Sequence, residues 1–290
     1  MNNKLFVGVA TALVTPFIDG KVDFNSMEKL IERQLESGVD ALVFCGTTGE
    51  APTLTEEEKK NIFEFAARTV HGRVPVICGA STNSHETTMR VSRMAKEAGA
   101  DALLCVSPYY NKGTPSGIVQ CYRDICSLGL PVILYNVPSR SGVDIKATVL
   151  SELSNESALF GIKECAGVGR ISEHKALYGE RFALYSGNDA EFLPSLSVGA
   201  DGVISVLSNL CPSRVKRIYR AFTEGRNSDA LSEHIALSEM CSLLFAQTNP
   251  APIKYALSTL GLCENSLRLP MSRIEGELCK KIENEMKKIE

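Results

Sequence analysis

Short apolar segments alternate with longer amphipathic segments along most of the chain. The apolar runs are rich in β-branched residues, which favours buried strands. The polar turns after them lead into stretches with an apolar residue about every 3.6 positions, which favours helices. The predicted strands cover residues 7–13, 41–45, 74–79, 102–106, 132–135, 160–163, 183–186 and 202–206. Their spacing of roughly 20 to 35 residues is typical of repeated βα units.

Helix-end signals support this pattern. Thr55 precedes three glutamates, as expected of an N-cap followed by acidic residues at the positive end of a helix dipole. Gly38 and Gly99 stand where helices should stop, and Gly199 begins another Gly-x-Asp ending. Eight units favour closure into a (β/α)8 TIM barrel over an open doubly wound sheet, which more often has about five or six strands and a glycine-rich dinucleotide loop. The sequence has no Gly-x-Gly-x-x-Gly.

The strand pattern ends near Gly225, and helices are predicted at 230–245, 252–260 and 275–288. We therefore divide the chain into a barrel domain, residues 1–225, and a C-terminal helical domain, residues 226–290. The second part has a size that suits an appendage better than an independent module.

Composition narrows the classes of function. The 290 residues are 44% hydrophobic and 22% charged, with a formal net charge of -3 and both signs scattered. No basic face for nucleic acid or for a membrane surface is predicted. No apolar run reaches the roughly 18 residues that span a bilayer. The first four residues lead directly into a strand-like segment, without the pattern of a secretory leader, so we expect a cytoplasmic protein.

Metal and disulfide chemistry are not indicated by the sequence. The ten cysteines occur singly, without Cys-x-x-Cys, and the four histidines do not cluster. Reduced, apolar core cysteines and no metal site are therefore expected.

Lys163 is the most informative single residue, because it ends a short apolar run that is predicted to be a buried strand. Burial lowers the pKa of an ammonium, and a neutral amine can attack a carbonyl carbon to form an imine. The alternative is that the strand end simply carries Lys163 to the surface. The lysine alone does not decide between the two.

In a TIM barrel, residues at the carboxyl ends of the strands converge on one face although they are far apart in the sequence. Those ends carry Thr11, Thr47, Thr48, Tyr109, Tyr110, Tyr135, Lys163, Ser186, Gly187 and Ser205. The Gly-Thr-Thr-Gly turn at 46–49 could bring backbone N–H groups to a small anion. Tyr135 could move a proton beside an amine, or could be a core filler. Arg140 could bind a carboxylate, or could be a solvated surface residue.

Eight motifs together resemble one family from end to end and in matching order. They are Gly-Thr-Thr-Gly-Glu at 46–50, Pro-Tyr-Tyr-Asn at 108–111, Tyr-Asn-Val-Pro-Ser-Arg at 135–140, Gly-Ile-Lys-Glu at 161–164, Ser-Gly-Asn-Asp at 186–189, Gly-Val-Ile-Ser-Val at 202–206, Asn-Pro-Ala-Pro-Ile-Lys at 249–254 and Leu-Arg-Leu-Pro at 267–270. The chain thus resembles the dihydrodipicolinate synthase family, within the superfamily of pyruvate-dependent class I aldolases and lyases.

The resemblance implies a homotetramer that condenses pyruvate with L-aspartate 4-semialdehyde on the diaminopimelate route to lysine. It implies that Lys163 forms the Schiff base, without metal or organic cofactor. Tyr135, Thr47 and Tyr110 would form a proton relay, with Tyr110 reaching in from a neighbouring subunit. The remaining expectations are that Thr48 holds the pyruvate carboxylate, Arg140 holds the semialdehyde carboxylate, and Gly187 and Ile204 line the pocket.

Three features depart from the commonest family pattern. Cys-Ala-Gly stands at 165–167, after the Lys-Glu pair, where a small residue followed by Ser or Thr is usual. At 79–83, Gly-Ala-Ser-Thr-Asn replaces the more common Gly-Thr-Gly start. The hydrogen bonds that support the catalytic side chains are therefore not predicted. In lysine-inhibited relatives, the effector pocket adjoins the positions of Tyr109 and Asn83. Here Lys59 would repel the effector's cationic end and Thr87 stands where a glutamate is frequent, so we predict weak or absent inhibition by lysine.

Two other readings of the sequence remain. A sibling aldolase, such as N-acetylneuraminate lyase or a 2-keto-3-deoxy sugar acid aldolase, would share the barrel and Lys163. The combination of Thr48 and Arg140 resembles the synthase more than the sialic acid lyases. A non-catalytic binding barrel is the alternative from a different class, and the presence of the amine with Thr47 and both relay tyrosines argues against it.

Overall fold

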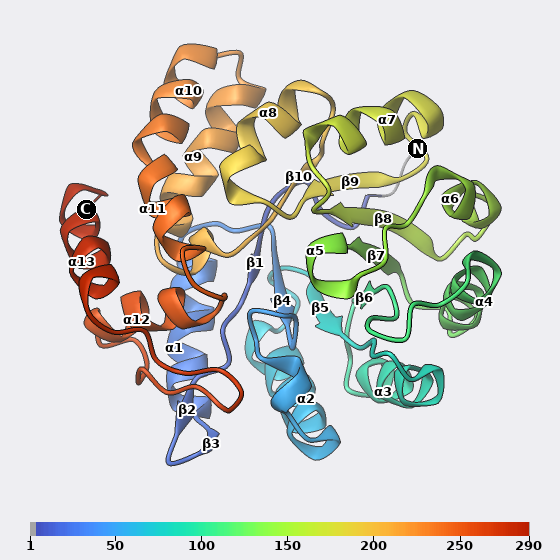
Figure 1. Ribbon diagram of the computed structural model, residues 1–290, viewed down its shortest axis with the longest axis horizontal. Coiled ribbons are helices and arrows are strands. Elements are labelled where there is room, and N and C mark those ends of the chain that lie inside the picture. Colours follow the sequence, from blue (N-terminus) through green and yellow to red (C-terminus); the bar gives the residue numbers. More distant parts are fainter. Residues whose placement is uncertain (1–3, 290) are drawn as a thin grey trace.

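Eight parallel strands close into a barrel in the computed structural model, which describes residues 4–289 (Figure 1). Around the barrel the strands are β1 (Gly8–Ala12), β4 (Ala41–Phe44), β5 (Val76–Gly79), β6 (Ala102–Val106), β7 (Val132–Asn136), β8 (Leu159–Glu164), β9 (Ala183–Ser186) and β10 (Gly202–Ser205). Strand β10 pairs with β1 and closes the ring. The predicted TIM barrel is confirmed, and the eight predicted strands differ from the observed ones only at their ends. Residues 1–3, with which the predicted barrel domain begins, lie outside the described residues.

Helices follow the strands and surround the barrel (Figure 1). They are α1 (Phe24–Glu36), α2 (Glu56–Val70), α3 (His85–Glu97), α4 (Pro115–Cys126), the short α5 (Pro138–Ser141), α6 (Ala147–Leu153), α7 (Val168–Tyr178), α8 (Phe192–Ser197) and α9 (Pro212–Thr223). The expected cap at Thr55 is present, because its side chain accepts from the N–H of Glu58 while the Glu58 carboxylate accepts from the N–H of Thr55.

Successive side chains of each strand point to opposite sides of the barrel wall and form two apolar layers, one inside the barrel and one between the strands and the helices. On β7, Val132 and Leu134 pack outward against the helices, whereas Ile133 and Tyr135 face the barrel interior. On β8, Ile162 packs in the outer layer. Lys163, the next residue, is therefore directed to the interior at the carboxyl end of the strand.

The interior is closed at the opposite end by an aromatic pair. The rings of Phe6 and Tyr185 are stacked with their centroids 4.2 Å apart, and the Tyr185 hydroxyl donates to the Phe6 carbonyl at 2.9 Å. Small residues such as Ala10 and Ala102 belong to the same interior cluster as this aromatic pair. The barrel is thus a packed core that opens only where the strands end.

Four helices follow the barrel: α10 (Asn227–Ala236), α11 (Ser238–Leu244), α12 (Ala251–Thr259) and α13 (Glu277–Ile289). The single helix expected at 230–245 was wrong, since the chain turns at buried Leu237 and forms α10 and α11. The turn preserves the apolar spacing, so periodicity alone did not reveal it. Helix α10 packs along α9, and the domain boundary at Gly225 stays a prediction.

The hydrophobic pattern also missed a small antiparallel hairpin, β2 (Phe17–Ile18) with β3 (Lys21–Val22). The ten cysteines are free thiols. Within residues 4–289, none of the helices has the length and apolar character needed to cross a bilayer.

Candidate active site

Lys163 lies at the carboxyl end of β8 with only 6% of its surface exposed. The register of the barrel pairs it with Tyr135 on β7, and its Nζ lies 4.4 Å from the centroid of the Tyr135 ring. Burial lowers the pKa of Lys163, nearby Arg140 lowers it further, and Cys165 and Asp189 act in the opposite direction. The surroundings thus favour the neutral, nucleophilic amine. The alternative of a solvated strand-end lysine is wrong.

Tyr135 also lies in a dry environment, and burial raises the pKa of its phenol. The phenol is therefore protonated at neutral pH and available as a proton donor. A hydrogen bond with the Thr47 side chain opposes the shift. The structure thus brings together Lys163, Tyr135 and Thr47, as the sequence predicted.

Gly187 leaves room for the lysine side chain. A Cβ added at this position would lie 2.2 Å from Cys165 Sγ and 2.9 Å from Lys163 Cε. Ile204 on β10 is fully buried in the same interior cluster as Tyr135. Gly187 therefore lies against Lys163, and neither residue is part of the lining of the cavity described below, so their place in the substrate pocket stays a prediction.

Thr48 is buried, and its hydroxyl accepts a hydrogen bond from Asn249 Nδ2 at 2.9 Å. Arg140 follows β7 on the short helix α5, and its guanidinium donates to the Asn249 carbonyl at 3.4 Å. Asn249 thus contacts both residues that were predicted to bind substrate carboxylates. The sequence analysis quoted Asn249 within a motif but gave it no role, because only the fold carries the loop before α12 to the barrel mouth.

Residues of the C-terminal region bind Glu50, which follows the turn that carries Thr47 and Thr48. The Glu50 carboxylate accepts from Lys254 Nζ at 2.6 Å and from the backbone N–H of Arg268 at 3.0 Å. Glu50 has a left-handed backbone, with φ of 54°. The sequence offered one signal for these contacts with Glu50. The motifs at 249–254 and 267–270 contain Lys254 and Arg268, for which no partner was predicted.

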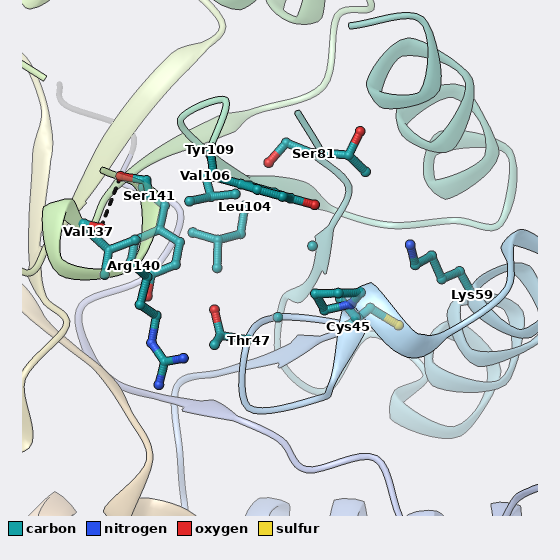
Figure 2. Close-up of a pocket in the computed structure, with 16 residues that line it drawn as sticks. Cys45, Thr47, Lys59, Ser81, Leu104, Val106, Tyr109, Val137, Arg140 and Ser141 are labelled. Atoms are coloured by element: carbon teal, nitrogen blue, oxygen red, sulfur yellow. Dashed lines mark hydrogen bonds between the residues drawn. The ribbon is translucent and has the colours of Figure 1, made fainter. Parts of the chain in front are cut away.

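Tyr135, against whose ring Lys163 packs, lines a cavity of about 220 Å³. Figure 2 shows the residues that line this cavity. Its lining consists of Cys45, Gly46, Thr47, Ala51, Pro52, Lys59, Gly79, Ser81, Thr82, Leu104, Val106, Tyr109, Tyr135, Val137, Arg140 and Ser141. Thr47, Tyr135 and Arg140 therefore line the cavity directly. Lys163 lies against the ring of Tyr135 rather than on the cavity wall.

Tyr110 is the predicted site residue that the single chain does not bring to the others. It is 87% exposed and has a φ of 70°. Its neighbour Tyr109 lines the cavity instead. An exposed tyrosine beside the barrel mouth could complete a site only by contact with another molecule.

Two buried acids that the sequence analysis quoted in motifs, without giving them a role, bind groups at the strand ends. Asp189 accepts from the N–H groups of Val206 and Leu207 at 2.9 and 3.0 Å, and burial raises its pKa. Glu164 accepts from Asn136 Nδ2 at 2.9 Å and lies 3.1 Å from His174 Nε2. These contacts fix the backbone on either side of the pocket.

Cys165 follows the Lys-Glu pair and lies near the Tyr135 phenol. Burial raises the pKa of the thiol to about 11, and a hydrogen bond with Tyr135 opposes this shift. The thiol therefore stays neutral at physiological pH and adds no charge beside Lys163.

A model of the Dihydrodipicolinate synthetase family matches residues 5–289. The chain belongs to this family. It is 43% identical over 286 residues to the 4-hydroxy-tetrahydrodipicolinate synthase of Alkaliphilus oremlandii, covering 98% of this chain and 99% of the relative. Among solved structures, the dihydrodipicolinate synthase of Aquifex aeolicus is 39% identical with a TM-score of 0.95, covering 98% of both chains. A structure described as a monomeric dihydrodipicolinate synthase variant is 37% identical with a TM-score of 0.96, covering 98% of this chain and 97% of the other.

Proposed function

We propose that the protein is a 4-hydroxy-tetrahydrodipicolinate synthase, a lyase that condenses pyruvate with L-aspartate 4-semialdehyde on the diaminopimelate route to lysine. The observation that carries this proposal is the buried Lys163 amine packed against the Tyr135 ring, in a chain that belongs to the family throughout its length. The single-chain geometry supplies the nucleophile, a phenol and a hydroxyl in one place.

The reaction begins when the neutral Lys163 amine attacks the ketone carbon of pyruvate. Loss of the ketone oxygen as water gives a protonated imine, which withdraws electrons from the adjacent methyl group. The methyl group then loses a proton, and the resulting enamine attacks the aldehyde carbon of the semialdehyde. The amine of the semialdehyde closes the ring at the imine carbon and releases Lys163. Because the imine itself accepts the electrons, the chemistry requires no metal and no organic cofactor.

Proton transfer in these steps is assigned to Tyr135, Thr47 and Tyr110. A relay of hydroxyls moves protons without placing a permanent charge beside the iminium. Thr48 and the backbone of its turn bind the pyruvate carboxylate, and Arg140 binds the carboxylate of the semialdehyde. Gly187 and Ile204 shape the walls around the imine.

The proposed assembly is a homotetramer in the cytoplasm, built from dimers in which Tyr110 enters the neighbour's site. The exposure of Tyr110 and its absence from the lining of the cavity support this arrangement. The proposed domain division is a catalytic barrel over 1–225 and a helical domain over 226–290. Inhibition by lysine is proposed to be weak or absent, because Lys59 repels a cationic ligand; half-inhibition at submillimolar lysine would contradict this.

Borohydride trapping tests the imine directly. Incubation with pyruvate and borohydride should attach a three-carbon acid to Lys163, as located by peptide mass mapping, and Lys163→Ala should lose both the adduct and nearly all turnover while keeping its fold. A non-catalytic barrel would give no adduct. A coupled assay with aspartate semialdehyde against N-acetylneuraminate separates the synthase from a sibling aldolase.

A further inference from the structure

Glu164 lies on the outer side of the barrel wall, directly behind the proposed nucleophile. Its neighbour Lys163 points into the barrel, and successive side chains of a strand point to opposite sides. Glu164 is only 1% exposed, so its carboxylate has lost its hydration. A buried carboxylate is costly unless hydrogen bonds replace the lost water. The proposed reaction makes no use of this group.

Within residues 4–289, groups from three different elements bind this carboxylate. Asn136 Nδ2 donates to both oxygens of Glu164, at 2.9 and 3.1 Å, and the Ala166 N–H donates to Oε1 at 2.7 Å. His174 Nε2 on α7 lies 3.1 Å from Oε2, and His174 is also 1% exposed. The Glu164 carboxylate therefore joins the end of β7, the turn after β8 and helix α7.

The hydrogen bond between Glu164 and Asn136 lies at the last pair of the β7–β8 register. One residue earlier, the same register pairs Tyr135 with Lys163. After the last pair the two strands end, and the chain continues into α5 on one side and α7 on the other. The ends of a strand ladder open more readily than its middle. The side-chain bond therefore closes the ladder next to the two residues that must stay together.

Asn136 is itself held on its other side. Its Oδ1 accepts from the Ile145 N–H at 3.0 Å, and its Nδ2 also donates to Asp144 Oδ1 at 3.2 Å. Asp144 in turn binds the Arg170 guanidinium on α7, at 3.3 and 3.1 Å. The network thus returns to the helix that carries His174. The outer side of the strand pair is therefore held as one unit.

We propose that Glu164 is a positioning residue for imine formation. Its hydrogen bond to Asn136 on the outer side of the barrel wall holds Lys163 beside Tyr135 on the inner side. This role rests on the proposed function, because it concerns the attack of the Lys163 amine on pyruvate. Lys163 Nζ lies 4.4 Å from the centroid of the Tyr135 ring, and small displacements of reacting groups slow a reaction strongly. Glu164 acts only through the strand ends, since its side chain faces away from the interior.

Single-turnover borohydride trapping of pyruvate tests this role. Glu164→Met keeps the length of the side chain and removes both oxygens. At saturating pyruvate, its trapping rate should fall at least about tenfold. The pyruvate concentration that gives the half-maximal rate should change less than about threefold, because the turn with Thr48 is untouched.

Glu164→Gln should keep the trapping rate within about threefold of normal, because the amide can replace the carboxylate in this network. Its oxygen can still accept from Asn136 and Ala166. Its N–H can donate to His174 Nε2 once the ring proton moves to Nδ1. In the described part of the chain, His174 Nδ1 is buried without a hydrogen-bond partner, so this shift breaks no bond at that nitrogen.

Arg181→Met is the matched control for stability, because it weakens the same strand at its opposite end. The Arg181 guanidinium donates to the carbonyls of Ser154, Glu156 and Leu159 at 2.5, 2.7 and 2.9 Å, and Leu159 begins β8. Loss of these bonds should lower the urea midpoint, as Glu164→Met does. The trapping rate of Arg181→Met should nevertheless stay within about threefold of normal.

Asn136→Ala removes the same hydrogen bond from its other side, and decides the question if Glu164→Met does not fold. It should slow trapping at least about tenfold, and the double variant should be no slower than the slower single variant. Unchanged trapping in Glu164→Met or Asn136→Ala, or an equally slow Glu164→Gln, would overturn the positioning role. So would multiplied effects in the double variant, or an equal loss in Arg181→Met. Absence of an adduct in the unaltered protein would overturn the proposed function itself, and this role with it.

Discussion

The ammonium of Lys254 lies 2.6 Å from Glu50 Oε1, and the two side chains are 0% and 2% exposed. This buried ion pair joins α12 to the turn that carries Thr47 and Thr48. The second Glu50 oxygen accepts from the backbone of Arg268, so the carboxylate is satisfied on both sides. The position of the turn is thus linked to the C-terminal helices.

Removal of one partner of this pair should be strongly destabilising. Lys254→Met leaves the Glu50 carboxylate buried without its cation, and we expect the free energy of unfolding to fall by about 3–5 kcal/mol. Urea unfolding measures the change. Lys280→Met is the matched control, because Lys280 pairs with Glu277 on the surface and should change stability by about 1 kcal/mol or less. Equal stability of the two variants would show that the pair does not hold the turn.

Gly187→Ala should impair imine formation. The new methyl group would overlap Cys165 Sγ and crowd Lys163 Cε, so the lysine must move from its place beside Tyr135. We expect the rate of borohydride-trappable adduct formation to fall at least about tenfold, since small displacements of reacting groups are costly. Gly169→Ala is the control, because nothing lies within 4 Å of the added Cβ. An unchanged trapping rate in Gly187→Ala would exclude a spatial role for this glycine.

Tyr135→Phe keeps the ring that packs against Lys163 but removes the phenol. Turnover should therefore fall by about 10²–10⁴-fold, the usual contribution of a positioned proton donor, with little loss of stability. Steady-state kinetics and thermal unfolding measure the two effects. Tyr178→Phe removes a phenol that donates to the Ala147 carbonyl away from the cavity, and should leave turnover near normal. Similar kinetics for both variants would remove Tyr135 from the relay.

The lowered pKa of Lys163 predicts the direction of a pH dependence. Only the neutral amine attacks pyruvate, so the rate of imine formation should rise with pH and level off once the pH passes the pKa of the folded protein. That pKa is below the usual 10.5, so the plateau should begin at a lower pH than for a solvated lysine. Single-turnover trapping across a pH series measures the profile. A rate still rising at pH 10.5 would contradict the burial argument.

Mixing two inactive variants tests whether Tyr110 acts in the neighbour's site. Lys163→Ala retains Tyr110, and Tyr110→Phe retains Lys163, so a mixed dimer rebuilds one complete site. After denaturation and refolding of an equal mixture, activity should return to about a quarter of normal, because half of the dimers are mixed and each has one working site. Persistent inactivity of the mixture, despite normal assembly, would place Tyr110 outside the shared site.

The order of the strands and the inward direction of Lys163 and Tyr135 could be predicted from the sequence. Both depend on local periodicity, which alternates along β7 and β8, and on the rule that parallel strand ends meet at one face. The motifs along the chain also indicated the family. The break at Leu237 could not be predicted, because the apolar spacing continues through it.

The sequence by itself therefore determined the barrel and the convergence of Lys163, Tyr135 and Thr47 at its mouth, because these follow from periodicity and from the rule that parallel strand ends meet at one face. Only the tertiary structure decided that Asn249 contacts Thr48 and Arg140 and that Lys254 neutralises Glu50. Such pairings join residues that are distant along the chain. Their charges and hydrogen bonds depend on which groups the folded chain excludes from water, and no local pattern records that.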